Sequence, residues 1–389
     1  MSSFKLCVVT GSRAEYHLLS PLLRRLSEDE DIELLIAVTG SHLSEAYGLT
    51  YQDIEADGFV IDGRIQILEE KDDVGAINRA IARAITGFSE YFQKAKPDAV
   101  LILGDRYELL GVATAAMNLR IPLIHLHGGE TTEGAVDEAI RHSLTKMSYL
   151  HFTSCEDYRR RVIQLGEDPK RVFNVGALGV ENILNCELLS REGFYQSIDK
   201  DLGEHFAVIT FHPVTLEEDT AAEQVNELFA AIKQFPELSF LFTKSNADSG
   251  GLVVNREIDR FVGASNNAYA VTSLGLKRYL SALSLADMVI GNSSSGIIET
   301  PSFGVPTVNI GNRQKGRIQA ANIINCEPEQ KSIEQAMKKA LSPQFVTTAH
   351  DAKNPYGDGR TSENIVRILK ESLFDQKANL MKKFYDIEG

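Results

Sequence analysis

Short runs of apolar and β-branched residues alternate with longer amphipathic stretches along most of the chain. In the first half, runs at 5–10, 34–39, 99–103, 123–126 and 149–153 predict strands, and stretches at 18–27, 74–94 and 107–117 predict helices. Strands that alternate with helices in this way form βαβ units, in which a parallel sheet carries helices on its faces. The pattern therefore predicts an α/β protein built on parallel sheets.

The same pattern starts again after a charged, glycine-containing segment at 190–203. Strands are predicted at 206–211, 239–243, 269–271, 288–290 and 307–309, and helices at 220–234, 276–286 and 297–303. A chain of 389 residues is too long for one ordinary hydrophobic core. We therefore expect a Rossmann-like, doubly wound domain at 1–180 and a second at 181–365, facing each other across a cleft. A C-terminal helix and tail at 366–389 are expected to pack back on the first domain.

The amino-acid composition excludes several classes of binding partner. A net charge of −14, from 54 acidic and 40 basic residues, gives no general attraction for nucleic acid or an anionic membrane. The apolar runs are too short to span a bilayer, and the N-terminus lacks the pattern of a signal peptide. The four cysteines form no CxxC pair, which favours reduced thiols and disfavours a zinc site. A cytoplasmic protein that holds any anionic ligand by local groups is expected.

Polar clusters follow several predicted strands, and ligands of open parallel sheets bind beyond those carboxyl ends. The turn at 11–13 opens a helix, whose backbone N–H groups and Arg13 could face a phosphate. An ordinary βα turn with a surface arginine is the alternative. At 104–108, Asp105 and Arg106 stand at the mouth of a buried strand, where charges are costly unless they are paired or used. An ion pair at the rim of the domain is the alternative there.

Two histidines, His125 and His127, lie at the next strand. Residues two apart on a strand face the same side and could bind a metal ion. No third ligand has a matching spacing, and Gly128 and Gly129 suggest close approach of another ligand instead. Glu130 follows directly and completes this cluster.

The next helix begins with acidic residues. Asp137 is placed at its start, nearest the ligand-binding edge, and it shares a helix face with Arg141. A solvated, salt-bridged helix is the alternative, which we favour for Glu138 but not for Asp137. Asp137 is therefore a candidate for the chemistry of the site.

A run of glycine, asparagine and serine at 291–296 opens a helix in the second half. Hydroxyl groups and glycines at a helix N-terminus are typical of a pyrophosphate site, whereas a simple cap needs only one such residue. Glu299 lies one turn further and would repel phosphate, but its carboxylate can accept hydrogen bonds from both hydroxyls of a ribose. The second half therefore predicts a site for a nucleoside diphosphate.

Taken in chain order, the clusters resemble the UDP-N-acetylglucosamine 2-epimerase family. The motifs are GSRAEY, TGSHL, GDRYE, HLHGGE followed by DEAIRH, FHPVT, SNADSGG, GNSSSGIIE and GNRQKGR, and they run from residue 11 to 317. The hydrolysing branch is the more similar one, which includes bacterial sialic-acid-type synthesis enzymes and the epimerase domain of a bifunctional animal enzyme. The non-hydrolysing branch looks like HVEAGLR where this chain has HLHGGE.

This resemblance implies a GT-B-like pair of Rossmann domains, a UDP-sugar substrate, a homodimer or homotetramer, and no metal or redox cofactor. UDP would be held mainly by the second domain. The residues that match the UDP site of the family are Arg13, Asn246, Ser293, Ser294, Gly296, Glu299 and Arg313, with His212 near the diphosphate.

The implied reaction converts UDP-GlcNAc to ManNAc and UDP by anti elimination to a 2-acetamidoglycal, followed by rehydration. It needs two acid/base groups on opposite faces of the ring and cations at the diphosphate. The candidate acids and bases are Asp105, Glu130 and Asp137, with His212 at the leaving group. The residues expected to line the sugar are His42, Arg106, His125, His127 and Arg141. Alternatives are a UDP-2,4-diacetamido-2,4,6-trideoxyglucose substrate of a legionaminic-acid-type pathway, a non-hydrolysing epimerase, and a GT-B glycosyltransferase.

Overall fold

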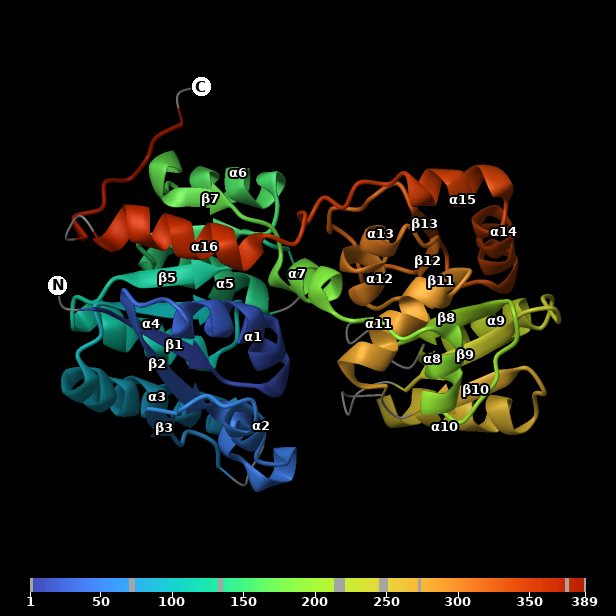
Figure 1. Cartoon of the computed structure of the whole chain (residues 1–389), viewed down its shortest axis with the longest axis horizontal. Coiled ribbons are helices and arrows are strands. Elements are labelled where there is room, and N and C mark those ends of the chain that lie inside the picture. Colours follow the sequence, from blue (N-terminus) through green and yellow to red (C-terminus); the bar gives the residue numbers. More distant parts are fainter. Residues whose placement is uncertain are drawn as a thin grey trace. The chain divides into compact units, whose positions relative to one another are not determined.

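The computed structural model describes residues 3–69, 74–131, 136–212, 221–244, 251–271, 274–374 and 378–387. The chain divides into two compact units, one made of the residues up to Asn182 together with those from Tyr356 onward, the other of Ile183–Pro355 (Figure 1). Each unit is a parallel sheet with helices on both faces, which confirms the predicted fold class.

The first unit contains a seven-stranded sheet in the order β3-β2-β1-β4-β5-β6-β7, and its strands pair in parallel. The strands are β1 Phe4–Thr10, β2 Ile32–Thr39, β3 Gly63–Ile65, β4 Ala99–Leu103, β5 Leu123–Leu126, β6 Leu150–Thr153 and β7 Val172–Asn174. The helices are α1 Arg13–Ser27, α2 Tyr51–Ala56, α3 Val74–Ala95, α4 Glu108–Asn118, α5 Val136–Met147, α6 Glu156–Gln164, α7 Leu178–Asn185 and α16 Thr361–Leu369.

Alternating side chains of β1 build the two cores of this unit. Leu6 and Val8 pack on the face covered by α1 and α16, whereas Cys7 and Val9 pack on the face covered by α3 and α4. Because side chains of a strand alternate between the faces, a strand buried on both sides must be apolar throughout, as β1 is. Gly111 of α4 permits close packing on α3, since a Cβ there would lie 2.4 Å from the Cβ of Ala84.

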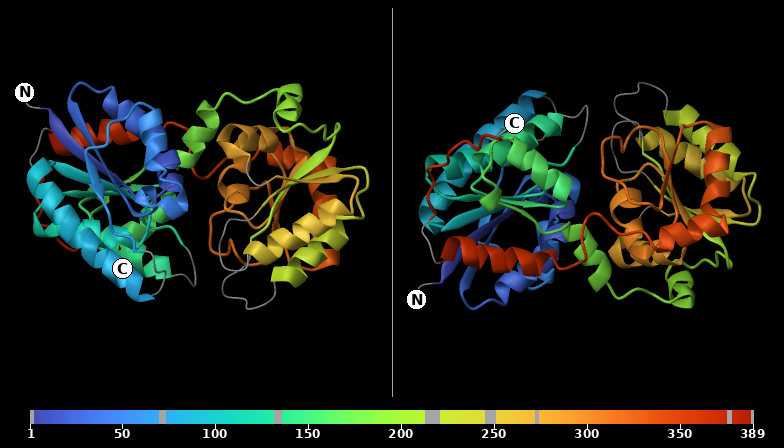
Figure 2. Two further views of the ribbon diagram at one scale, coloured as in Figure 1. Left: turned by 90° about the horizontal axis from the view of Figure 1, so that it is seen from below. Right: turned by 90° about the horizontal axis from the view of Figure 1, so that it is seen from above.

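The second unit repeats this architecture of a parallel sheet between helices (Figure 2). Its six strands have the order β10-β9-β8-β11-β12-β13. The strands are β8 Phe206–Thr210, β9 Ser239–Thr243, β10 Ala268–Val271, β11 Met288–Gly291, β12 Thr307–Ile310 and β13 Ile323–Cys326. The helices are α8 Arg191–Ser197, α9 Ala221–Ile232, α10 Gly251–Gly263, α11 Gly275–Leu285, α12 Ser295–Ile298, α13 Thr300–Phe303, α14 Gln330–Ala340 and α15 Pro343–His350.

The strand order reverses once in each sheet, between β1 and β4 in the first unit and between β8 and β11 in the second. At such a switch point the loops after the two strands diverge to opposite faces, and ligands of this fold bind there. The loops after β1, β4, β8 and β11 carry four of the polar clusters singled out in the sequence.

Three differences from the sequence prediction concern the edge strands, one helix and a domain boundary. Strands β3 and β13 are edge strands of three and four residues, too short for a periodic signal. The helix predicted at 297–303 is two single turns, α12 and α13, because Pro301 has no N–H to continue the ladder. The predicted boundary at 365 falls inside α16, which packs on α1 and belongs as a whole to the first unit.

The C-terminal segment stays with the first unit after α16. A π-helical turn at Lys370–Phe374 follows the helix, and the segment 378–387 contacts the ends of α5 and α6. Among the described helices, none is both long and apolar enough to cross a membrane.

Candidate active site

The loop after β1 presents a helix N-terminus at the switch point of the first unit. The Ser12 hydroxyl caps α1 by accepting from the N–H of Glu15 at 3.4 Å. Within the described residues, the N–H groups of Arg13 and Ala14 donate to no protein acceptor, and the Arg13 side chain is exposed. A fifteen-residue helix with a cation in its first turn is suited to an anion at this edge.

Two buried carboxylates, Glu15 and Glu108, lie beneath this loop; they belong to the GSRAEY and GDRYE motifs but were not among the candidate site residues. Glu108 is fully buried and accepts from Arg106 Nε at 2.5 Å, while Glu15 accepts the N–H of Gly11 at 2.7 Å. Burial, followed by the nearby charge of Glu108, raises the pKa of Glu15 from 4.5 to about 7. The only sequence signal was their place shortly after the ends of β1 and β4.

Arg141 links Asp105 to the loop that carries Glu130 at the other side of the switch point. Its guanidinium pairs with Asp105, donates to the Glu130 carbonyl at 2.7 Å and pairs with Glu138 at 2.7 Å. Burial raises the pKa of Asp105, the charge of Arg141 opposes that rise, and the charges of Asp137 and Glu130 add to it. Asp137 lies in the first turn of α5 and is exposed. Asp105, Glu130 and Asp137 are therefore close enough to interact electrostatically, at the ends of three different elements.

The Glu130 carboxylate is held by a hydroxyl and approached by a histidine. Its Oε1 accepts from Ser154 Oγ at 2.8 Å and lies 3.3 Å from His127 Nδ1. His127 has a left-handed backbone, with φ +62°, so it no longer belongs to the strand. His125 and His127 therefore do not share a strand face, which corrects that expectation. In the described part of the chain, no three histidine, cysteine, aspartate or glutamate residues are grouped to hold a metal ion.

Two of the residues expected at the sugar have no exposed surface. His42 lies between the hydroxyls of Thr10, at 3.1 Å, and Thr50, at 2.9 Å, and burial lowers its pKa to about 4. His125 is bonded to the Gly104 carbonyl at 2.8 Å, and burial lowers its pKa to about 3. Both side chains are buried and link the ends of neighbouring strands, so in this structure they support the loops and present no surface to a ligand.

In the second unit, an asparagine joins the loops after β8 and β11. The side chain of Asn292 accepts the His212 N–H and donates to the His212 carbonyl, both at 2.8 Å. The preceding Gly291 has φ +137°, and a Cβ there would lie 1.9 Å from the Thr210 carbonyl oxygen. Only glycine fits where the two strand ends approach so closely. His212 is thereby held in place at the switch point.

The residues 293–299 form the predicted diphosphate and ribose cluster. Within the described residues, the N–H groups of Ser293 and Ser294 donate to no protein acceptor. Ser295 Oγ donates to Glu299 at 2.7 Å and bonds to the Tyr279 hydroxyl at 2.7 Å. Burial raises the pKa of Glu299, and the Ser295 hydrogen bond opposes the rise. Gly296 is packed against Thr307, since a Cβ added at Gly296 would lie 3.1 Å from Thr307 Cγ2.

Arg313 reaches the same turn from the loop after β12. Its Nη1 donates to the Asn292 carbonyl at 3.0 Å, and Gln314 Nε2 donates to that oxygen at 2.8 Å. Gln314 was not singled out in the sequence, where nothing marks it except its neighbour. Asn246, the remaining residue matched to the UDP site, lies outside the described residues. Arg13 belongs to the first unit, whereas the other UDP candidates belong to the second.

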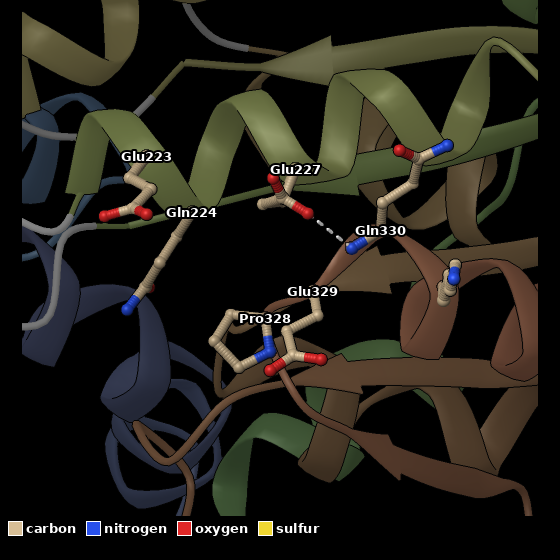
Figure 3. Close-up of a pocket in the computed structure, with 7 residues that line it drawn as sticks. Glu223, Gln224, Glu227, Pro328, Glu329 and Gln330 are labelled. Atoms are coloured by element: carbon tan, nitrogen blue, oxygen red, sulfur yellow. Dashed lines mark hydrogen bonds between the residues drawn. The ribbon is translucent and has the colours of Figure 1, made fainter.

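Three pockets lie at the carboxyl ends of the strands. One of about 660 Å³ is in the first unit, between the loops after β2, β3 and β4 and the start of α3. One of about 540 Å³ in the second unit is lined by the loop that carries Arg313 and by the end of β13. A third, of about 510 Å³, lies between α9 and the start of α14 and is lined by Glu223, Glu227 and Glu329, with the Gln330 N–H donating to Glu227 (Figure 3). Its negative charge makes the third unsuited to a diphosphate.

Two doubly wound units with polar clusters at their switch points define a GT-B-like protein. A solved structure of a UDP-GlcNAc 2-epimerase from Neisseria meningitidis, bound to UDP-GlcNAc, has the same fold, with a TM-score of 0.82 at 18% identity over 95% of this chain and 100% of that one. The family model for UDP-N-acetylglucosamine 2-epimerase matches residues 24–370. The chain belongs to the UDP-N-acetylglucosamine 2-epimerase family and is therefore an epimerase-type enzyme, as the motifs predicted.

Relatives in this family place the chain nearer its hydrolysing members. It is 42% identical to the GDP/UDP-N,N'-diacetylbacillosamine 2-epimerase (hydrolyzing) of Campylobacter jejuni, over 89% of each chain. It is 41% identical to the polysialic acid biosynthesis protein P7 of Escherichia coli, over 98% of this chain and 97% of that one. It is 36% identical to the UDP-N,N'-diacetylbacillosamine 2-epimerase (hydrolyzing) of Legionella pneumophila, over 94% and 95%.

Proposed function

We propose that this protein is a hydrolysing 2-epimerase of a UDP-2-acetamido sugar, which releases UDP and the free 2-epimer. With UDP-GlcNAc the product would be ManNAc, the precursor of sialic-acid-type sugars. The observation that carries the proposal is the proximity of Glu130 and Asp137 to Asp105, which is paired with the buried Arg141 at the edge of the first sheet. Relatives named as hydrolysing 2-epimerases support it.

The chemistry requires that loss of the C2 proton be coupled to departure of UDP, because no carbonyl group adjoins C2 to stabilise a carbanion. In the first step a base takes the C2 proton, the C1–C2 double bond forms, and the C1–O bond breaks with its electron pair leaving on UDP. In the second step a proton adds to C2 on the opposite face, and water supplies the hydroxyl at C1. The sum is hydrolysis with inversion at C2.

Asp105, Glu130 and Asp137 are proposed as the acid/base groups. Burial and the neighbouring carboxylates raise the pKa of Asp105, and a raised pKa brings a carboxyl group closer to the operating pH of an acid/base catalyst. Arg141 holds Asp105 in place and limits the rise. Because three carboxylates are grouped here, one can take a proton while another gives one, as the two steps require.

The second unit is proposed to bind UDP. The N–H groups of Ser293 and Ser294 and the guanidinium of Arg313 would face the diphosphate, and Glu299 the ribose. The other proposed members of this site are Gly296, His212, Asn246 and, from the first unit, Arg13. Donors aimed at the leaving diphosphate stabilise the charge that develops as the C1–O bond breaks.

Two candidate donor substrates differ only in the sugar that is linked to UDP. The Escherichia coli relative is named for polysialic acid synthesis, which favours UDP-GlcNAc. The Campylobacter and Legionella relatives are named for diacetylbacillosamine, a 2,4-diacetamido-2,4,6-trideoxy sugar. Both donors carry the 2-acetamido group and the UDP that the proposed steps need.

The deciding experiment incubates the protein with each donor in heavy water and separates the products by chromatography. The expected products are UDP and a free 2-epimerised sugar with one deuterium at C2. An intact UDP-linked epimer without free UDP would indicate the non-hydrolysing reaction instead. Turnover that requires an acceptor and leaves C2–H in place would indicate a glycosyltransferase.

A further inference from the structure

The pocket of about 660 Å³ in the first unit, here named the β3 pocket, has walls of two kinds. Its apolar side chains come from the loops after β2 and β3 and from the first turns of α3. Its polar groups come from the same loops and from the residue after Asp105. The lining used below is Leu43, Leu68, Ala76, Ile77 and Ala80 on the apolar side, and Ser41, Ser44, Gln66 and Arg106 on the polar side.

Among the described residues that line the β3 pocket, Arg106 is the basic one. Arg106 lines the pocket, and its Nε donates to the buried Glu108 at 2.5 Å, which fixes the guanidinium. Two acids line the pocket: Glu69 is paired with Arg79 at 2.8 Å and Arg83 at 2.5 Å, and Glu45 is exposed. The pocket therefore offers hydrogen-bond donors beside an apolar surface.

The β3 pocket begins next to the proposed acid/base group. Arg106 follows Asp105 directly, so the Cα atoms of the two residues are about 3.8 Å apart. In a pyranose ring the C4–C5 bond lies across from the C1–C2 bond, and C6 is attached to C5. When the reaction at C1 and C2 takes place beside Asp105, the C4 and C6 substituents of the sugar must point away from Asp105.

We propose, resting on the function proposed above, that the β3 pocket receives the C4 and C6 substituents of the sugar and selects a 4-acetamido, 6-deoxy sugar. The acetamido methyl and the C6 methyl lie on the apolar side, and the amide oxygen accepts from Arg106. In UDP-GlcNAc, the C4 hydroxyl and the C6 hydroxymethyl contact less of the apolar side of the pocket and place polar groups against it. A methyl-sized difference in an apolar pocket changes kcat/KM by about 10- to 200-fold.

The test compares kcat/KM for UDP release from UDP-2,4-diacetamido-2,4,6-trideoxyglucose and from UDP-GlcNAc. The wild-type enzyme should prefer the diacetamido donor by about tenfold or more. Ile77→Ser removes apolar surface from a side chain that is already 37% exposed, so the fold should persist. It should lower kcat/KM for the diacetamido donor at least about fivefold more than it lowers kcat/KM for UDP-GlcNAc, so that the ratio of the two values falls.

A matched control is Met117→Ser, which changes another exposed apolar side chain on a helix of the same unit, outside the β3 pocket. It should leave both values unchanged. A wild-type enzyme that prefers UDP-GlcNAc, or an Ile77→Ser variant that keeps the wild-type ratio, would overturn the pocket assignment while the epimerase proposal stands. Release of UDP from neither donor would overturn the proposed function itself.

Discussion

Arg141 and Asp105 form an ion pair that joins α5 to the end of β4, and Arg141 is only 3% exposed. The same guanidinium binds the carbonyl of Glu130 after β5, so one buried cation positions the ends of two neighbouring strands. Because a buried charge is costly without partners, this arrangement fixes the position of Asp105 relative to the backbone at Glu130. The predictions below follow from this geometry and from other buried groups.

Asp137→Asn should abolish most turnover while UDP binding is retained. The side chain is exposed in the first turn of α5, so the substitution should lower the rate of the reaction without unfolding the protein. Removing a general acid or base typically lowers kcat by about 10²- to 10⁴-fold. Steady-state kinetics and calorimetric titration with UDP measure the two quantities. Asp157→Asn, in the first turn of α6, is the matched control and should keep wild-type activity. Wild-type turnover in Asp137→Asn would remove Asp137 from the mechanism.

Glu15 should make the protein less stable as the pH rises. Burial raises its pKa from 4.5 to about 7, so the unfolded chain loses this proton at lower pH than the folded chain. The free energy of unfolding should therefore fall between about pH 4.5 and pH 7, by an amount on the order of 3 kcal/mol.

Glu15→Gln tests this by removing the titration. Relative to wild type it should be more stable at pH 8 and nearly equal at pH 4, as measured by urea unfolding. Glu30→Gln, at an exposed carboxylate close by in the sequence, should show no such pH-dependent gain. Equal gains at both pH values in Glu15→Gln would mean that Glu15 is ionised normally in the folded protein.

We expect Lys382 to stabilise the first unit against unfolding at acid pH. Its ammonium contacts the fully buried Glu167 at 2.8 Å and also caps the end of α5 through the carbonyls of Lys146 and Ser148. Burial alone would raise the pKa of Glu167, but hydrogen bonds from His151, Lys146 and Lys382 lower it to about 2. This stabilisation is present above the ordinary carboxyl pKa and is lost as the pH falls from about 4.5 toward 2.

Lys382→Met removes one partner of Glu167 and should shift the acid-unfolding midpoint to higher pH. Lys383→Met is the control, because that neighbouring side chain is exposed. Circular dichroism during acid titration gives both midpoints. Identical midpoints for the two variants would show that the segment around Lys382 contributes nothing to the stability of Glu167.

Gly291→Ala should destabilise the second unit severely. The backbone has φ +137°, and the new methyl group would meet the Thr210 carbonyl oxygen at 1.9 Å. We expect a loss of about 3 kcal/mol or more, because both the conformation and the space exclude a side chain. Gly263→Ala, where no atom lies within 4 Å of the added carbon, should change stability by less than about 1 kcal/mol. Thermal unfolding of both variants makes the comparison, and similar melting temperatures would contradict the geometry.

The site could be predicted from the sequence only in part. Asp105, Glu130 and Asp137 were found because each follows a strand or opens a helix, which is a local signal. Glu108 and Glu15 stood in the quoted motifs but were assigned no role, since their burial beneath Gly11 depends on packing between β1 and β4. His42 and His125 were assigned to the sugar for their position, but they face threonine hydroxyls and a carbonyl in the interior.

The sequence by itself determined the alternation of strands and helices, the repeat of the architecture in two halves and the order of the family motifs. These are properties of residues that are neighbours along the chain, where periodicity and turn chemistry act. Only the tertiary structure decided which polar side chains are buried, that Arg141 binds Asp105, and that Lys382 reaches Glu167. Those outcomes depend on contacts between residues far apart in sequence, and desolvation and charge at such contacts have no local signal.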